Sequence, residues 1–118
     1  MSQSQLKSAI IILGLATGLI HLYLNIRLGR LDIPFTLNGL GYLALTTAIA
    51  RPFAMLAGKE KLVHYGFMVF TLITIIAWWM FGDTSDLLGI FDKIIEVVLI
   101  VVLWLRVRHL GNTTNATR

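Results

Sequence analysis

Three ionisable residues interrupt one of the most apolar stretches of the sequence. Asp92, Lys93 and Glu96 lie in the first half of the run Gly89–Trp104, whose other residues are mostly aliphatic. Asp92 and Glu96 are four residues apart, so a helix would place both carboxylates on one face, where they can bind a proton, a cation or a hydrogen-bond donor. An unpaired charge in a membrane-spanning helix costs about 2.5–3.5 kcal/mol, which predicts that partners come from elsewhere in the chain.

Candidate partners occur at the same spacing in two other apolar segments. His21 and Asn25 are four residues apart, and so are Asn38 and Tyr42. At about 1.5 Å of rise per residue, antiparallel helices would bring these pairs to nearly the depth of the acidic pair. Lys93 could pair with Glu96 or extend its long side chain to the membrane surface. We therefore expect one buried polar cluster, which comprises His21, Asn25, Asn38, Tyr42, Asp92, Lys93 and Glu96.

Two interpretations of this cluster remain open. Hydrogen bonds between membrane helices contribute about 0.6 kcal/mol each and fix the register of the helices, so the cluster could be structural. Ionisable residues inside membranes also form proton relays, ion sites and ligand pockets. No nucleophile and base arrangement and no nucleotide-binding motif occurs in the sequence, so no catalytic residue is predicted.

Metal and haem chemistry are alternatives at the same residues. His21, Asp92 and Glu96 are ligand types that suit iron, zinc or manganese. His21 alone could hold a pigment or a five-coordinate haem. A haem between two histidines is not expected, because His64 would lie about 15 Å from His21 along the membrane normal, and His109 lies beyond the last apolar run. No metal or other cofactor is predicted.

The composition places the cluster in a membrane protein. Of the 118 residues, 57% are hydrophobic and only 14% are charged, whereas about a quarter of an ordinary soluble chain is charged. The chain has no cysteine, which excludes disulfides, thiolate catalysis and cysteine-ligated zinc. The net charge of +4 comes from residues beside the apolar runs, so nucleic-acid binding is not predicted.

The apolar runs predict an all-α, polytopic bundle of four transmembrane helices with antiparallel neighbours. A span needs about 20 apolar residues. Pro34 opens the second run, Arg51 and Pro52 close it, and Gly14 and Gly18 form a GxxxG pattern at which another helix can pack closely. The predicted spans are 8–28, 33–50, 62–81 and 87–105, within one domain over 1–110 that is followed by a disordered polar tail over 111–118.

The distribution of basic residues predicts the orientation. The N-terminal run is long for a signal peptide and is expected to be retained as the first span. Four spans put both termini on one side of the membrane, and Arg27 and Arg30 lie on the other side. The side of the termini has Lys7, Arg51, Lys59, Lys61, Arg106, Arg108 and Arg118. The positive-inside rule then places both termini in the cytoplasm of a prokaryotic cell, with the chain in the plasma membrane.

Three segments carry a resemblance to known sequences. At TGLIHL (17–22), PFTLNGLGYL (34–43) and DKIIEVVLIVVL (92–103), the chain resembles an uncharacterised family of small four-span prokaryotic membrane proteins, found mainly in halophilic archaea. The resemblance implies the same fold and draws attention to His21, Asp92, Lys93 and Glu96, but it implies no activity. The chain departs from a halophilic protein in being basic.

Two functions fit these observations. The first, which we predict, is an accessory or structural subunit of a larger membrane complex, for example a membrane-bound oxidoreductase, because the chain is small and lacks catalytic motifs. Its partners would be the lipid bilayer and other membrane subunits. The second is a self-contained proton- or ion-handling bundle, or a small transporter, that uses His21, Asp92 and Glu96. Neither makes the chain an enzyme on its own.

Overall fold

Four helices make up most of the chain in the computed structural model, which describes residues 1–51 and 58–116. The prediction of an all-α fold is confirmed. Pro52, which was expected to help end the second span, lies outside the described residues. The helices are α1 (Gln3–Leu28), α2 (Ile33–Ala50), α3 (Glu60–Phe81) and α4 (Leu87–Ala116).

Local capping explains where the first two helices begin and end. Ser2 and Gln5 form a capping box, which lets α1 begin at Gln3, before the predicted start of the apolar span at residue 8. α1 ends at Gly29, which adopts a left-handed conformation with φ of 69°, where glycine is unstrained. Asp32 then accepts a hydrogen bond from the backbone N–H of Phe35 and caps α2, with Pro34 in its first turn.

The last helix is longer than the sequence predicted. α4 begins at Leu87 as expected but continues to Ala116, past the predicted end of the span at residue 105. It therefore includes most of the segment 111–118 that was predicted to be a disordered tail. Apolar character sets the end of a membrane span, whereas a helix continues into polar sequence until a proline or a cap stops it. No proline follows residue 105.

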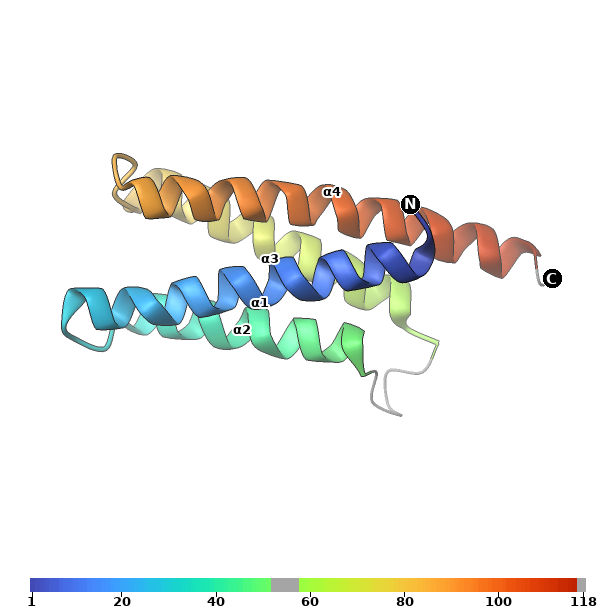
Figure 1. Cartoon of the computed structure of the whole chain (residues 1–118), viewed down its shortest axis with the longest axis horizontal. Helices are drawn as coiled ribbons and strands as arrows, with labels where there is room; N and C mark the ends of the chain where they lie inside the picture. Colours follow the sequence, from blue (N-terminus) through green and yellow to red (C-terminus); the bar gives the residue numbers. More distant parts are fainter. Residues whose placement is uncertain (52–57, 117–118) are drawn as a thin grey trace.

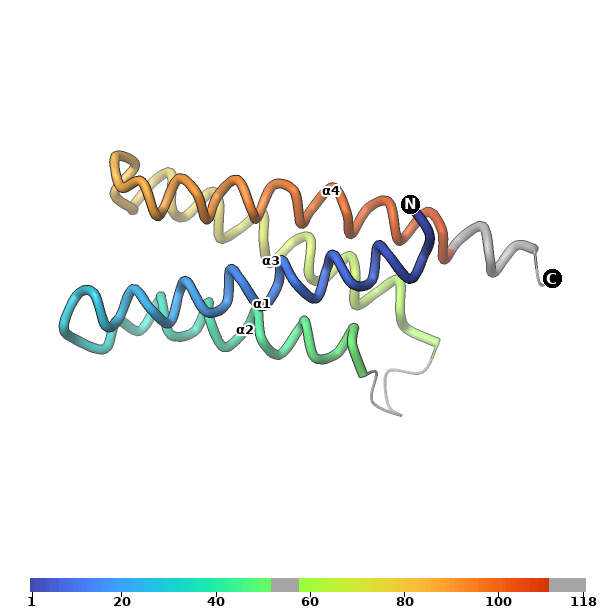
Figure 2. Tube along the Cα trace, viewed as in Figure 1, coloured from blue at the N-terminus to red at the C-terminus, as the bar shows by residue number. Residues whose placement is uncertain are grey.

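The helices form two antiparallel hairpins that pack side by side (Figures 1 and 2). α1 packs against α2 and α4, and α3 packs against α4 and α2, which closes the bundle. The α1–α2 and α3–α4 connections lie at one end, which we call the loop end. The start of α1 and the end of α4 lie toward the other, which we call the termini end.

Three of the four helices in the described part of the chain are long and apolar enough to cross a membrane. These are α1, α2 and α3, with 26, 18 and 22 residues. α4 is longer, with 30 residues, and contains Asp92, Lys93 and Glu96 in its first half. A span of about 20 residues matches the roughly 30 Å of hydrocarbon in a bilayer.

The side chains are arranged in the opposite way to those of a soluble bundle, with apolar residues facing outward and charged residues buried. Leu19, Ile73 and Val97 are more than half exposed, while Asp92 and Glu96 are buried. Soluble proteins almost never bury such groups unless they are paired. An apolar layer fills the bundle toward the termini end, and it comprises Leu6, Ile10, Ile49, Phe67, Leu99 and Leu103.

Candidate functional site

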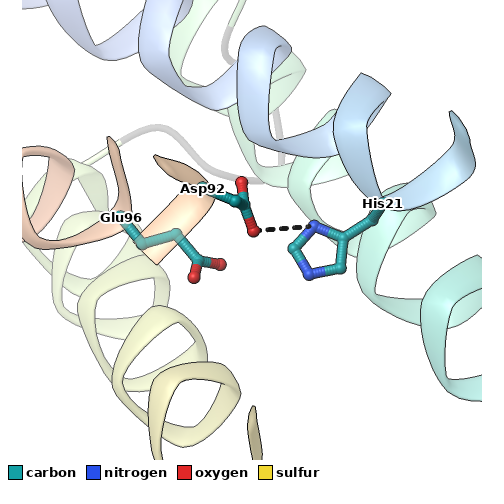
Figure 3. A group of neighbouring side chains, drawn as sticks. All are labelled: His21, Asp92 and Glu96. Atoms are coloured by element: carbon teal, nitrogen blue, oxygen red, sulfur yellow. Dashed lines mark ion pairs between the residues drawn. The ribbon is translucent and has the colours of Figure 1, made fainter. Parts of the chain in front are cut away.

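The buried charges come together at the centre of the loop-end half of the bundle. α1 contributes His21, and one turn of α4 contributes Asp92 and Glu96, whose carboxylates point toward the His21 ring (Figure 3). One ligand atom from each of these three residues lies within 4.8 Å of the others. The structure therefore brings together the histidine and the two acidic residues that the sequence selected.

Each carboxylate accepts a hydrogen bond from a hydroxyl on a neighbouring helix. Thr17 of α1 donates to Asp92 at 2.6 Å and lies 3.4 Å from Glu96. Tyr42 of α2 donates to Glu96. These three helices are thus linked through the two acids. Hydrogen bonds to charged groups contribute about 1.5–3 kcal/mol, which offsets part of the cost of burying the charges.

Lys93 supplies the positive charge of the site. Its ammonium lies 3.2 Å from Asp92 and also pairs with Glu96. It further lies 5.7 Å from the centre of the Trp78 ring, within the range of a cation–π interaction. Of the two positions that the sequence allowed, the structure has the internal pair: only 8% of Lys93 is exposed, and the side chain does not extend to the surface.

The His21 ring is oriented by the backbone of its own helix. Its Nδ1 lies 2.8 Å from the carbonyl oxygen of Thr17, and this oxygen can only accept, so Nδ1 carries a proton. The same nitrogen lies 3.7 Å from Asp92. The ring also packs against Tyr42, with centroids 5.4 Å apart. Nε2 is then the ring nitrogen that can gain or lose a proton without breaking the Thr17 contact.

A cavity of about 520 Å³ reaches this cluster from the loop end. His21, Asp92 and Lys93 line it, while Glu96 and Tyr42 do not. The site thus has a layer that borders the cavity and a deeper layer behind it. Much of the wall is apolar or aromatic, and the residues that form it include Leu24, Pro34, Phe35, Ala77, Trp78 and Phe81.

Two polar pairs lie at the loop end, and one member of each lines the cavity. Arg27 donates two hydrogen bonds of 3.0 Å to Asp86, which joins the end of α1 to the α3–α4 connection. In the same connection, the backbone N–H and hydroxyl of Ser85 donate to Asp83 and lower the pKa of that carboxyl. Asp83 and Asp86 both line the cavity, and the charge of Asp86 is balanced by Arg27.

The two asparagines of the predicted cluster lie apart from its centre. Asn25 donates to Thr36 at 2.8 Å and accepts from the backbone N–H of Asp32 at 2.7 Å, so it organises the α1–α2 turn. Asn38 accepts from Thr74 at 3.3 Å and links α2 to α3. Asn25 therefore lies outside the cluster to which the sequence assigned it, because the turn uses both ends of its amide.

Gly14 and Gly18 lie where α1 packs against α2. A Cβ atom at Gly14 would overlap the Thr46 hydroxyl. One at Gly18 would come within 3.0 Å of Leu43 and 3.3 Å of the backbone oxygen of Gly39. The GxxxG pattern thus lies at a close helix contact inside the chain.

Two members of the site were not singled out by the sequence. Thr17 binds both the acid and the histidine, and Trp78 borders the Lys93 ammonium. The sequence did contain one indication of Thr17: it lies four residues before His21, on the same face of α1 as the buried histidine. A threonine hydroxyl usually bonds its own helix, as in Thr47 and Thr71, so spacing alone does not reveal one that points across to another helix.

The contacts of the buried cluster affect whether it could bind a metal ion. His21, Asp92 and Glu96 could supply three ligands to a metal ion. The Lys93 ammonium already contacts both carboxylates, so a metal ion would have to displace it. His64, one of the two further histidines considered for haem, bonds to Arg106 near the termini end.

No known protein family, curated protein or solved structure matches the chain in the comparisons that we made. The chemistry of the site therefore has to be inferred from its geometry.

Proposed function

We propose that the chain is an integral membrane protein with four spans and both termini in the cytoplasm. The apolar character of α1, α2 and α3 supports this, together with the buried position of the charges of α4. The outward face of α4, with Ile94, Val97 and Val101, is apolar, so this helix can also contact lipid. The excess of lysine and arginine near the termini end supports the orientation.

We further propose that this bundle handles protons through the cluster of His21, Asp92, Lys93 and Glu96. The observation that carries the proposal is that charged members of a buried network border a cavity that residues of the loop end, such as Gly82 and Asp83, also line. A network that served only to fix helix register would need no such access. A proton can reach Nε2 of His21 or Asp92 through the cavity and pass on to Glu96 behind them.

The charge balance of the cluster favours proton binding. Two carboxylates and one ammonium leave one negative charge while His21 is neutral. Burying a net charge is costly, and one bound proton would remove it. The donors Thr17 and Tyr42 stabilise whichever carboxylate remains ionised.

The access is one-sided. On their helices, Ile10, Phe67 and Leu99 lie between the cluster and the termini end, and all three are buried. This apolar layer separates the cluster from the other face of the bundle. The arrangement fits proton binding from the loop end better than a continuous path through the protein.

The role of an accessory subunit is the competing function. It would require a partner on the outward faces of the helices, and no specific contact among the described residues favours one. Purification in a mild detergent separates the two functions. A lone monomer or homo-oligomer supports the proposal, and a stable larger assembly with other proteins supports the accessory role.

The proposal is tested by infrared titration of the purified protein. We expect the carbonyl band of a protonated carboxylic acid to appear reversibly as the pH falls, and to shift in D₂O because the cavity admits solvent. Asp92→Asn or Glu96→Gln should remove or displace this band, whereas Asp83→Asn, at the loop end, should leave it unchanged.

A band that is absent in the wild type, or that is insensitive to both core substitutions, would overturn the proposal. Helix content and elution volume establish that each variant is folded. If neither core variant folds, Tyr42→Phe provides the same test, because it removes the donor to Glu96 and should move the midpoint of the band.

A further inference from the structure

A second buried polar group lies in the termini-end half of the bundle, apart from the proton site. His64 of α3 and Arg106 of α4 meet there, with Nε2 of the histidine 2.9 Å from Nη1 of the arginine. They border a separate cavity of about 240 Å³, which Lys7 of α1 also lines. At about 30 Å³ per water molecule, this cavity has room for a tetrahedral anion and its hydration.

The hydrogen bonds of His64 show which edge of the Arg106 guanidinium is already occupied. His64 donates from Nδ1 to the carbonyl oxygen of Glu60 at 2.6 Å, so its Nε2 is an acceptor for Nη1 of Arg106. The opposite edge of the guanidinium, which carries Nε and Nη2, makes no bond to His64. Nε is buried, and within 1–51 and 58–116 no atom accepts a hydrogen bond from it. A buried N–H without an acceptor is costly, which points to a missing partner.

The charges around this edge favour an anion. No carboxylate in the described part of the chain forms an ion pair with Arg106 or with Lys7. α3 begins at Glu60, and no side chain caps its first N–H groups, which adds positive potential at this end. Glu60 also lines the cavity, but it is exposed, so solvent screens its charge.

We propose that this cavity binds a phosphate group, most directly the headgroup of an anionic lipid. Arg106 and Lys7 both line the cavity and give it two positive charges, and the N–H groups of a guanidinium bind phosphate oxygens well. The pocket lies at the end of the bundle where lysine and arginine gather, and basic pockets between membrane helices on that side are typical sites for anionic headgroups. Inorganic phosphate offers the same chemistry in solution.

Native mass spectrometry of the purified protein tests this proposal, with dioleoylphosphatidylglycerol as the probe and dioleoylphosphatidylcholine as the zwitterionic comparison. We expect Arg106→Gln to weaken binding of the anionic lipid about tenfold, the effect of losing one hydrogen-bonding contact to a charged group. Arg108→Gln is the matched control, because Arg108 is exposed and packs on Trp104, 5.0 Å from its ring centre. It should change binding less than about twofold.

Inorganic phosphate distinguishes the two sources of the ligand. If phosphate displaces the lipid from the wild type, the pocket is a general phosphate site; if it does not, the pocket selects the lipid. Equal effects of Arg106→Gln and Arg108→Gln, or binding of both lipids alike, would rule out the proposal. If Arg106→Gln does not fold, Lys7→Gln is compared with Lys61→Gln, and equal binding by these two variants would likewise rule it out.

Discussion

Asp92, Lys93 and Glu96 are tolerated in an apolar helix because each of them has a partner of suitable charge or donor type. The ammonium lies between two carboxylates, and each carboxylate also accepts from a hydroxyl on another helix. Removing one member of a buried ionic network costs more than the network contributes as a whole, since it leaves the other members unpaired. Lys93 is therefore expected to contribute more to the stability of the protein than its position in the sequence suggested.

Lys93→Met should destabilise the protein by about 3–5 kcal/mol, because it leaves two carboxylates buried without their cation. The free energy of unfolding, measured by titration with a denaturing detergent, checks the prediction.

Two further variants make this test specific. Lys61→Met, at an exposed position of α3, should change stability by less than about 0.5 kcal/mol. Adding Glu96→Gln to Lys93→Met should recover part of the loss, because it removes one of the two unpaired charges. Additive losses in the double variant would show that the two residues are not coupled.

Residue spacing predicted the centre of the site but not its edges. Asp92, Glu96 and His21 could be found because ionisable groups in apolar helices need one another, and because their depths agreed. Asn25 could not be assigned correctly, since depth along a straight helix does not show that the turn after α1 takes up its amide. Whether Lys93 points inward or outward depends on packing that one sequence does not reveal.

At the scale of helices, glycine positions decide how closely α1 and α2 approach. A Cβ atom at Gly39 would lie 2.8 Å from Leu22 and 3.0 Å from the backbone oxygen of Gly18. The leucine can move, but the backbone oxygen belongs to a helix and cannot move alone. Because His21 and Tyr42 sit on these two helices, their separation also determines the geometry of the site.

Gly39→Ala should therefore destabilise the protein by about 1–3 kcal/mol through overpacking of α1 against α2. Gly66→Ala is the matched control: it lies within α3, and no atom lies within 4 Å of its added Cβ. It should leave stability unchanged or raise it by up to about 1 kcal/mol, the helix propensity of alanine over glycine. Thermal unfolding in detergent compares the two, and equal losses would show that the close approach is unimportant.

The helix boundaries follow from the sequence more closely than the pairing of side chains. The predicted limits of α2 agree with the structure because Asp32, Pro34 and the polar Arg51 mark them locally. α1 and α4 extend beyond the predicted spans, since the search for apolar length cannot see a capping box or a helix that continues in polar sequence. The prediction was therefore sufficient for α2, whose ends coincide with those of the apolar run, and insufficient for α1 and α4, which extend beyond theirs.

At the scale of the whole molecule, topology is the property that can be measured most directly. The chain has no cysteine, so single cysteines can report orientation without a background. The loop end and the termini end should lie on opposite sides of the membrane.

In intact cells, a cysteine introduced as Ser85→Cys should react with a membrane-impermeant thiol reagent, because it lies in the α3–α4 connection at the loop end. Asn115→Cys should react only after the cells are opened. The reverse pattern would invert the orientation, and labelling of both in intact cells would mean that α4 does not cross the membrane.

The apolar layer beneath the cluster has an electrical consequence. In a membrane arranged as proposed, a proton that enters at the loop end and stops at Asp92 or Glu96 crosses only part of the bilayer, while Phe67, Leu99 and Leu103 insulate the remainder. Moving one charge across the whole membrane changes its energy by about 2.3 kcal/mol per 100 mV of membrane potential. A proton that crosses only part of the membrane changes its energy by a fraction of that amount. Occupancy of the cluster would then depend on membrane voltage as well as on pH, although no helix has to move.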